Sequence, residues 1–177
     1  MTRIIELTPH DSNWADSAMD EARAISKALA SNVLAVHHIG STAIPGILAK
    51  PTLDLLVEVW ELQAVDQANP AMIALGYEPH GEYGMPGRRY FVKKKGEKHT
   101  HHVHVFQKGN PEIERHLNFR DYLISHPEEA RAYAELKERL AQDFRTDPEG
   151  YTEAKSDFIK RVDEKAMQFY GDRSRRA

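Results

Sequence analysis

The run from Leu53 to Val57 constrains the fold of this chain more than any other segment. Its side chains alternate between the two sides of a strand, and all of them are apolar except that of Asp54. Because an acid in a buried strand costs free energy unless it is paired, Asp54 is a candidate for chemistry. The turn Gly40-Ser41-Thr42 lies ahead of this strand, and its small and hydroxyl-bearing residues make it a candidate phosphate cradle.

The remaining patterns predict an α/β (α+β) fold, with a mixed sheet, helices on it and a C-terminal helical part. Apolar spacing predicts helices over residues 11–31, 61–75, 111–125, 128–145 and 150–170, and strands over residues 33–38, 53–59, 88–94 and 101–107. Gly96 lies between the last two strands and indicates an antiparallel hairpin. We expect an α/β core over residues 1–110 and a helical part over residues 111–177, packed as one compact unit.

Composition excludes several classes of function. The chain has 177 residues, no cysteine and a net charge of −3, so disulfides, zinc–thiolate sites and thiol catalysis are absent and no general nucleic-acid surface is expected. The first ten residues carry no apolar signal core, and the apolar runs are too short to span a bilayer. We therefore expect a cytoplasmic protein without membrane attachment.

A histidine-rich strand supplies the second candidate constellation. In the run from His101 to Val105, strand alternation places His102 and His104 on one face. With Asp54 on a neighbouring strand, they form a set suited to a divalent metal. The alternative is the polar face of an edge strand, with both imidazoles hydrogen-bonded to water.

Basic and aromatic residues form weaker patterns. One arginine of the pair Arg88-Arg89 should face inward, where it could hold a phosphate, although an ordinary salt bridge explains the pair equally well. Tyr133 with Lys137 and Tyr151 with Lys155 each place a ring and an amine on one helical face, as does the region of Arg120. These residues could close over a ligand, but tyrosine at the core edge with lysine extending past it is the alternative. The Gly40-Ser41 turn taken alone is typical of structural turns, and the P-loop spacing is absent.

Several blocks taken together make the chain recognisable. They are His38-Ile-Gly-Ser-Thr-Ala-Ile-Pro-Gly46, Lys50-Pro51 with Asp54, Thr100-His101-His102-Val103-His104, Phe119-Arg120-Asp121-Tyr122-Leu123 with His126-Pro127, and the two tyrosine–lysine pairs. With these blocks the chain resembles the GrpB family over nearly its whole length. That family is placed in the nucleotidyltransferase superfamily, and some relatives are fused to dephospho-CoA kinase. The resemblance thus implies a nucleotidyltransferase-like core with a cleft for a nucleotide or another phosphorylated small molecule.

The chain departs from the superfamily pattern at one position. Active relatives usually carry two acids on the strand after the Gly-Ser turn, and Thr52 stands where the first acid is expected. The later strand offers His102 and His104 in place of a third acid. Magnesium prefers several anionic oxygens, whereas one carboxylate with two imidazoles suits zinc, manganese, nickel or iron better.

These observations lead to one set of predicted site residues. The catalytic and metal-binding residues are Asp54, His102 and His104, with Mg, Mn or Zn as the metal. The ligand-binding residues are Gly40, Ser41, Thr42, Lys50, Arg89, Arg120, Tyr133, Lys137, Tyr151 and Lys155. The predicted function is nucleotide or phosphate binding, with transfer of a nucleotidyl group to a small molecule. The alternatives are a non-catalytic protein that binds a nucleotide or a CoA precursor, and a metal-dependent hydrolase.

Overall fold

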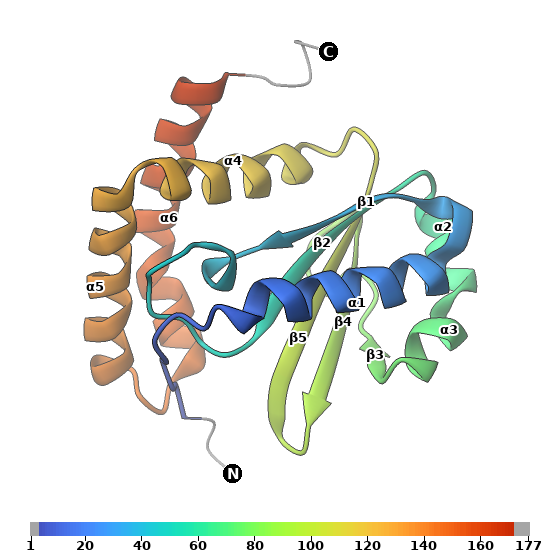
Figure 1. Cartoon of the computed structure of the whole chain (residues 1–177), viewed down its shortest axis with the longest axis horizontal. Coiled ribbons are helices and arrows are strands. Elements are labelled where there is room, and N and C mark those ends of the chain that lie inside the picture. Colours follow the sequence, from blue (N-terminus) through green and yellow to red (C-terminus); the bar gives the residue numbers. More distant parts are fainter. Residues whose placement is uncertain (1–3, 172–177) are drawn as a thin grey trace. The chain divides into compact units, whose positions relative to one another are not determined.

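The strand predicted over residues 53–59 is β2 (Leu53–Val59), which pairs parallel with β5 (Lys98–Gln107) and antiparallel with β1 (Val33–Ile39). The computed structural model describes residues 4–171, and its sheet has five strands in the order β1-β2-β5-β4-β3 (Figure 1). The strand β4 (Arg88–Lys95) forms the predicted antiparallel hairpin with β5, and β3 (Tyr77–Pro79) pairs antiparallel with β4. The fold class is therefore confirmed as a mixed sheet with helices.

Strand register gives the sheet two unlike faces. On one face Asp54 lies level with His102, and Tyr90 lies level with His104. The opposite face is apolar at its centre, where Leu55, Val57, Val103, Val105 and Phe91 are buried. This apolar face packs against α1 (Asn13–Leu29), whose side chain Ile25 is fully buried, and against α2 (Leu62–Gln67). The burial of these aliphatic side chains is what makes β2 and β5 the centre of the sheet.

The described residues divide into two units. One comprises Ser12–Gly40 and Thr52–Ile113 and holds the sheet with α1, α2 and α3 (Asn69–Ala74). The other comprises the segment up to Asp11, the loop Ser41–Pro51 and the chain from Glu114 onward. The prediction placed the boundary of the helical part at residue 111. In the structure the loop Ser41–Pro51 groups with the helical unit instead of with the sheet.

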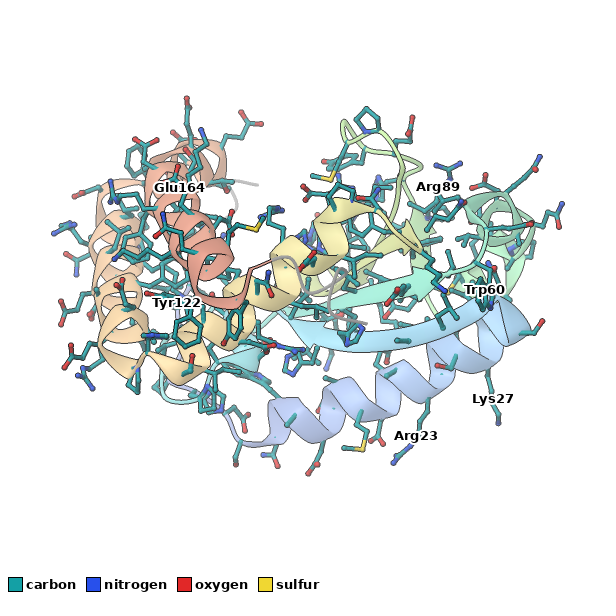
Figure 2. The ribbon with its side chains drawn as sticks, turned by 90° about the horizontal axis from the view of Figure 1, so that it is seen from above. Arg23, Lys27, Trp60, Arg89, Tyr122 and Glu164 are labelled. Atoms are coloured by element: carbon teal, nitrogen blue, oxygen red, sulfur yellow. The ribbon has the colours of Figure 1, made fainter. Side chains whose placement is uncertain are left out.

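The helical unit contains α5 (Pro127–Asp143), α6 (Pro148–Tyr170) and most of α4 (Pro111–Ser125). The helices α5 and α6 run side by side (Figure 1). Their apolar side chains pack with α4 and with the loop in one cluster that contains Ile44, Ile47, Tyr122 (labelled in Figure 2), Leu123, Ala130, Tyr133, Val162 and Ala166. The loop is therefore anchored by two isoleucines that the sequence does not mark as periodic.

Two predicted elements differ in the structure. The helix expected over residues 61–75 is two short helices, because the chain turns at Ala68 and starts again with Pro70 in the first turn of α3. The three-residue strand β3 was not predicted, since it is too short to show alternation. Among residues 4–171, no helix has the length and apolarity needed to cross a bilayer.

Candidate functional site

Asp54 and two imidazoles meet on the polar face of the sheet. Oδ1 of Asp54 lies 3.4 Å from Nδ1 of His102 and 3.4 Å from Nε2 of His104. The parallel pairing of β2 with β5 places His102 beside Asp54, and strand alternation returns His104 to the same face two residues later. The structure thus brings together the three residues predicted as catalytic.

The two imidazoles hold Asp54 as a carboxylate. Burial alone would raise the pKa of Asp54, but hydrogen bonds from His102 and His104 and their charges outweigh it, so the pKa lies below its ordinary value. Such a carboxylate accepts protons poorly and instead orients the imidazoles that donate to it.

Two further histidine and tyrosine side chains extend this group. Nδ1 of His99 lies 2.8 Å from Nε2 of His102, so both nitrogens of the His102 ring have partners. The ring of Tyr90 lies 5.7 Å from that of His102 and 5.2 Å from that of His104, between centroids. Neither His99 nor Tyr90 was predicted. The only sequence signal for Tyr90 is that it alternates with Arg88 on a strand next to β5.

The side chains around Asp54 do not form a preorganised metal site. Within residues 4–171, no group of three or more histidine, aspartate or glutamate side chains is disposed to hold a metal ion. The imidazole nitrogens that would coordinate a metal are those that face the carboxylate, and a metal would have to displace their protons. The metal therefore stays a prediction, and the donor set favours Zn²⁺ over Mg²⁺.

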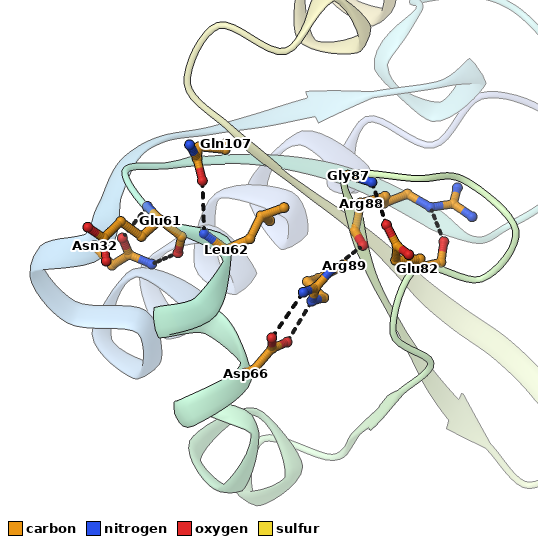
Figure 3. Close-up of polar contacts among 9 residues, drawn as sticks. All are labelled: Asn32, Glu61, Leu62, Asp66, Glu82, Gly87, Arg88, Arg89 and Gln107. Atoms are coloured by element: carbon orange, nitrogen blue, oxygen red, sulfur yellow. Dashed lines mark hydrogen bonds and ion pairs between the residues drawn. The ribbon is translucent and has the colours of Figure 1, made fainter.

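The structure also decides between the two arginines of β4. Arg89 lies on the apolar face of the sheet, where its guanidinium forms a bidentate pair with Asp66 of α2 at 2.6 and 3.0 Å (Figure 3). Arg89 thus forms the salt bridge to a helix carboxylate that was the alternative to phosphate binding, on the face opposite to Asp54. Ligand binding by Arg89 stays a prediction. Arg88 lies on the face of Asp54, with its guanidinium 4.8 Å from the centroid of Tyr90.

Five of the predicted ligand-binding residues gather within the helical unit. Nζ of Lys50 and Nζ of Lys155 each lie 4.4 Å from the centroid of Tyr151. Nζ of Lys137 lies 4.8 Å from the centroid of Tyr133 and donates a hydrogen bond to the carbonyl of Leu48. We call these three lysines the lysine cluster: Lys50 of the loop Ser41–Pro51, Lys137 of α5 and Lys155 of α6.

Lys137 is the buried member of the lysine cluster, with 2% of the residue exposed. Burial, together with the positive charges of Lys155 and Lys50, lowers the pKa of Lys137 to about 7. Burial also raises the pKa of Tyr151, so its phenol stays neutral. The charges that act on Lys137 are thus of its own sign, and a bound anion would relieve their repulsion.

The other predicted ligand residues have more ordinary surroundings. Thr42 is 2% exposed, and its short 3-10 turn is closed by the amide of Ile44, which donates to the carbonyl of Ser41 at 3.1 Å. Nε of Arg120 donates to its neighbour Asp121 at 2.8 Å. A role of Ser41, Thr42 or Arg120 in ligand binding stays a prediction. Thr52 donates its hydroxyl to the carbonyl of His99 at 3.1 Å and so fastens β2 to the hairpin.

Comparison with known proteins shows the family. The model of the family described as "GrpB protein" matches residues 4–165. The crystal structure of the conserved protein GrpB from Enterococcus faecalis has a TM-score of 0.89 at 41% identity, covering 93% of this chain and 99% of that one.

Two further similarities cover less than half of the matched protein. The UPF0157 protein YqkA of Bacillus subtilis is 44% identical over 167 residues, which are 94% of this chain and 48% of that protein, so the chain spans about half the length of this relative. A crystal structure of the Cid1 poly(U) polymerase bound to MgATP has a TM-score of 0.46 at 14% identity, covering 75% of this chain and 45% of that one. That similarity is too distant to indicate an activity.

Proposed function

The chain belongs to the GrpB family, and from that premise we propose that it binds a nucleotide or another phosphorylated small molecule through its lysine cluster. One observation carries the proposal: three lysines converge on the rings of Tyr151 and Tyr133, and one of them is buried. Burial and the positive charges of Lys155 and Lys50 make the charged form of Lys137 costly. A phosphate chain would offset the cost with several charge-assisted hydrogen bonds.

Each lysine has a distinct part in this proposal. Lys50 and Lys155 are half-buried and lie against Tyr151, so their ammonium groups can contact the phosphate directly. Lys137 is buried, and a nearby anion would raise its pKa from about 7 and return it to the charged form. Binding of phosphate should therefore be coupled to uptake of a proton between pH 7 and pH 10.

A finer proposal, which concerns the sheet unit by itself, assigns a nucleotidyl transfer step to Asp54 with His102 and His104. An acceptor hydroxyl oxygen bonds to the α-phosphorus of a nucleoside triphosphate while the bond from that phosphorus to the bridging oxygen breaks. Pyrophosphate leaves with the electron pair, and the hydroxyl proton passes to the imidazole–carboxylate group. Asp54 orients the imidazoles in this step, in keeping with its lowered pKa.

A second candidate is a non-catalytic protein that binds a nucleotide or a CoA precursor. The position of Thr52 favours it, because the hydroxyl there is bonded to the carbonyl of His99 and supplies no second carboxylate beside Asp54. Magnesium-dependent phosphoryl transfer generally relies on more than one carboxylate.

Turnover separates these candidates. The protein is incubated with each nucleoside triphosphate, a mixture of small-molecule hydroxyl acceptors and Mg²⁺ or Mn²⁺, and released pyrophosphate is measured. Release that Asp54→Asn abolishes, with nucleotide affinity unchanged, supports transfer. Tight binding without pyrophosphate release supports the non-catalytic candidate, and absence of any nucleotide binding contradicts both.

A further inference from the structure

Tyr83 holds a backbone conformation that is rare for a tyrosine. It lies in the loop over residues 80–87 between β3 and β4, with φ at +47° and 64% of the residue exposed. A tyrosine rarely adopts this left-handed region, where glycine or asparagine would fit better. Exposure of a large ring also forgoes the gain from burying it. Residues held in such conformations concentrate at ligand sites.

The loop is built to keep Tyr83 in place. The guanidinium of Arg88 donates to the carbonyl of Tyr83 at 2.8 Å and to that of Glu82 at 3.2 Å. The amide of Gly87 donates to the carboxylate of Glu82 at 2.6 Å (Figure 3). These hydrogen bonds join residues 82 and 83 to residues 87 and 88 across the loop. They therefore fix the backbone that carries the ring of Tyr83.

The ring of Tyr83 is the outermost of a series of aromatic side chains in contact, and the innermost of them contact Asp54. It stacks on Tyr90 with the centroids 5.1 Å apart and the planes 16° apart. Tyr90 in turn lies beside His102 and His104, the partners of Asp54. Tyr90 thus covers one face of the Tyr83 ring. The ring of His80 lies against Tyr83 at an angle of 66°, with the centroids 5.3 Å apart, and 64% of Tyr83 stays exposed.

We propose that the exposed face of Tyr83 is a stacking platform for a planar heteroaromatic ring, specifically a nucleobase. A preformed, backbone-locked aromatic face suits a flat ring, because stacking needs no rearrangement of the protein. The inference concerns the sheet unit by itself and goes beyond the proposed function, since it names a class of planar ring that this unit would bind. Its basis is separate from the lysine cluster, because all its residues belong to the sheet unit.

A nucleoside without phosphate tests the platform directly. Adenosine and ribose are titrated into the full chain, and affinity is measured from chemical-shift changes. We expect adenosine to bind and ribose not to bind. Tyr83→Leu, which keeps an apolar side chain but removes the π face, should weaken adenosine binding about 5- to 150-fold, the range given by one base–aromatic stack. Tyr83→Trp should retain it.

Trp60→Leu is the matched control. Trp60 (labelled in Figure 2) is likewise an exposed aromatic residue of the sheet unit, with 52% of the residue exposed. Nζ of Lys108 lies 4.8 Å from the centroid of its ring. Adenosine binding should survive this change. The inference is overturned if wild-type protein does not bind adenosine, or if Tyr83→Leu and Trp60→Leu weaken binding equally. Inorganic tripolyphosphate, titrated in parallel, reports on the lysine cluster alone, so its binding distinguishes failure of the platform from failure of the proposed function.

Discussion

A Cβ atom at position 40 would lie 2.8 Å from Oδ2 of Asp54, so Gly40 is the residue that lets the backbone approach this carboxylate. Its φ of +72° adds a second reason for glycine. The sequence singled out Gly40 as part of a phosphate cradle. The structure gives it a definite role beside Asp54, in which it leaves room for the carboxylate that His102 and His104 hold.

Gly40→Ala should therefore destabilise the protein by about 2–4 kcal/mol, the sum of a steric clash and left-handed backbone strain. The control is Gly46→Ala, at φ +79° with nothing within 4 Å of the added Cβ. That change should cost only the strain, about 1–2 kcal/mol. Chemical denaturation of both variants measures the difference. Equal losses would show that Gly40 does not make room for Asp54.

The buried Lys137 should make stability depend on pH above neutrality. Its pKa is about 7 in the folded protein and about 10.5 in the unfolded chain, so between these values the unfolded state binds more protons. Stability should rise with pH over this window, by up to about 1.4 kcal/mol per pH unit, and level off above it.

Lys137→Met removes the titrating group and should abolish this rise. Urea unfolding of both proteins at pH 7, 8 and 9 supplies the comparison. An identical pH dependence in the two proteins would show that Lys137 is not held in a buried, charge-repelled state.

Metal binding at Asp54 should be linked to protons, because the nitrogens of His102 and His104 that face the carboxylate are the ones a metal needs. We expect Mg²⁺ at millimolar concentration to leave the imidazole signals unchanged. Any Zn²⁺ binding should release protons, measured by calorimetric titration in two buffers of different ionisation enthalpy, and be lost in Asp54→Asn. Zn²⁺ binding that releases no protons and does not depend on Asp54 would place the metal elsewhere.

The backbone strain at Tyr83 predicts an order of stability for two truncated variants. Tyr83→Gly and Tyr83→Ala both remove the ring, but only glycine adopts φ +47° freely. The glycine variant should be more stable than the alanine variant by about 1 kcal/mol. Thermal unfolding of the two variants measures this difference. If Tyr83→Ala proves as stable as Tyr83→Gly, the left-handed conformation carries no strain. It then no longer supports a functional role of Tyr83.

Local sequence patterns predicted the elements well, since side-chain alternation and helical spacing are local properties. The bounds Leu53–Val59 of β2 match the prediction. Which arginine of β4 faces Asp54 depends on register with β5, which a single strand does not reveal. The lysine cluster was predicted only as helical pairs and single residues. Its assembly depends on the loop Ser41–Pro51 packing through Ile44 and Ile47 onto the helices, a contact between distant parts of the chain.

The residues that were not predicted from the sequence were missed for the same reason, because their roles depend on contacts that no local pattern shows. Tyr83 lies in a loop without periodicity, and its stacking on Tyr90 follows from a left-handed backbone held by Arg88. His99 was not predicted as a partner of His102. Its bond to His102 depends on the irregular register between Lys93 and Lys94 near the hairpin tip, which no local pattern predicts.

Calorimetric titration with inorganic tripolyphosphate tests the central claim most directly, with Lys155→Met compared against Lys165→Met. Both lysines lie on α6, and the control residue Lys165 is bonded to Glu129 away from the lysine cluster, so the two variants change net charge equally. We predict that Lys155→Met weakens binding at least about tenfold, as expected for loss of one charge-assisted contact, while Lys165→Met leaves it within about twofold. Equal affinities of the two variants, or no binding by the wild-type protein, would contradict the account.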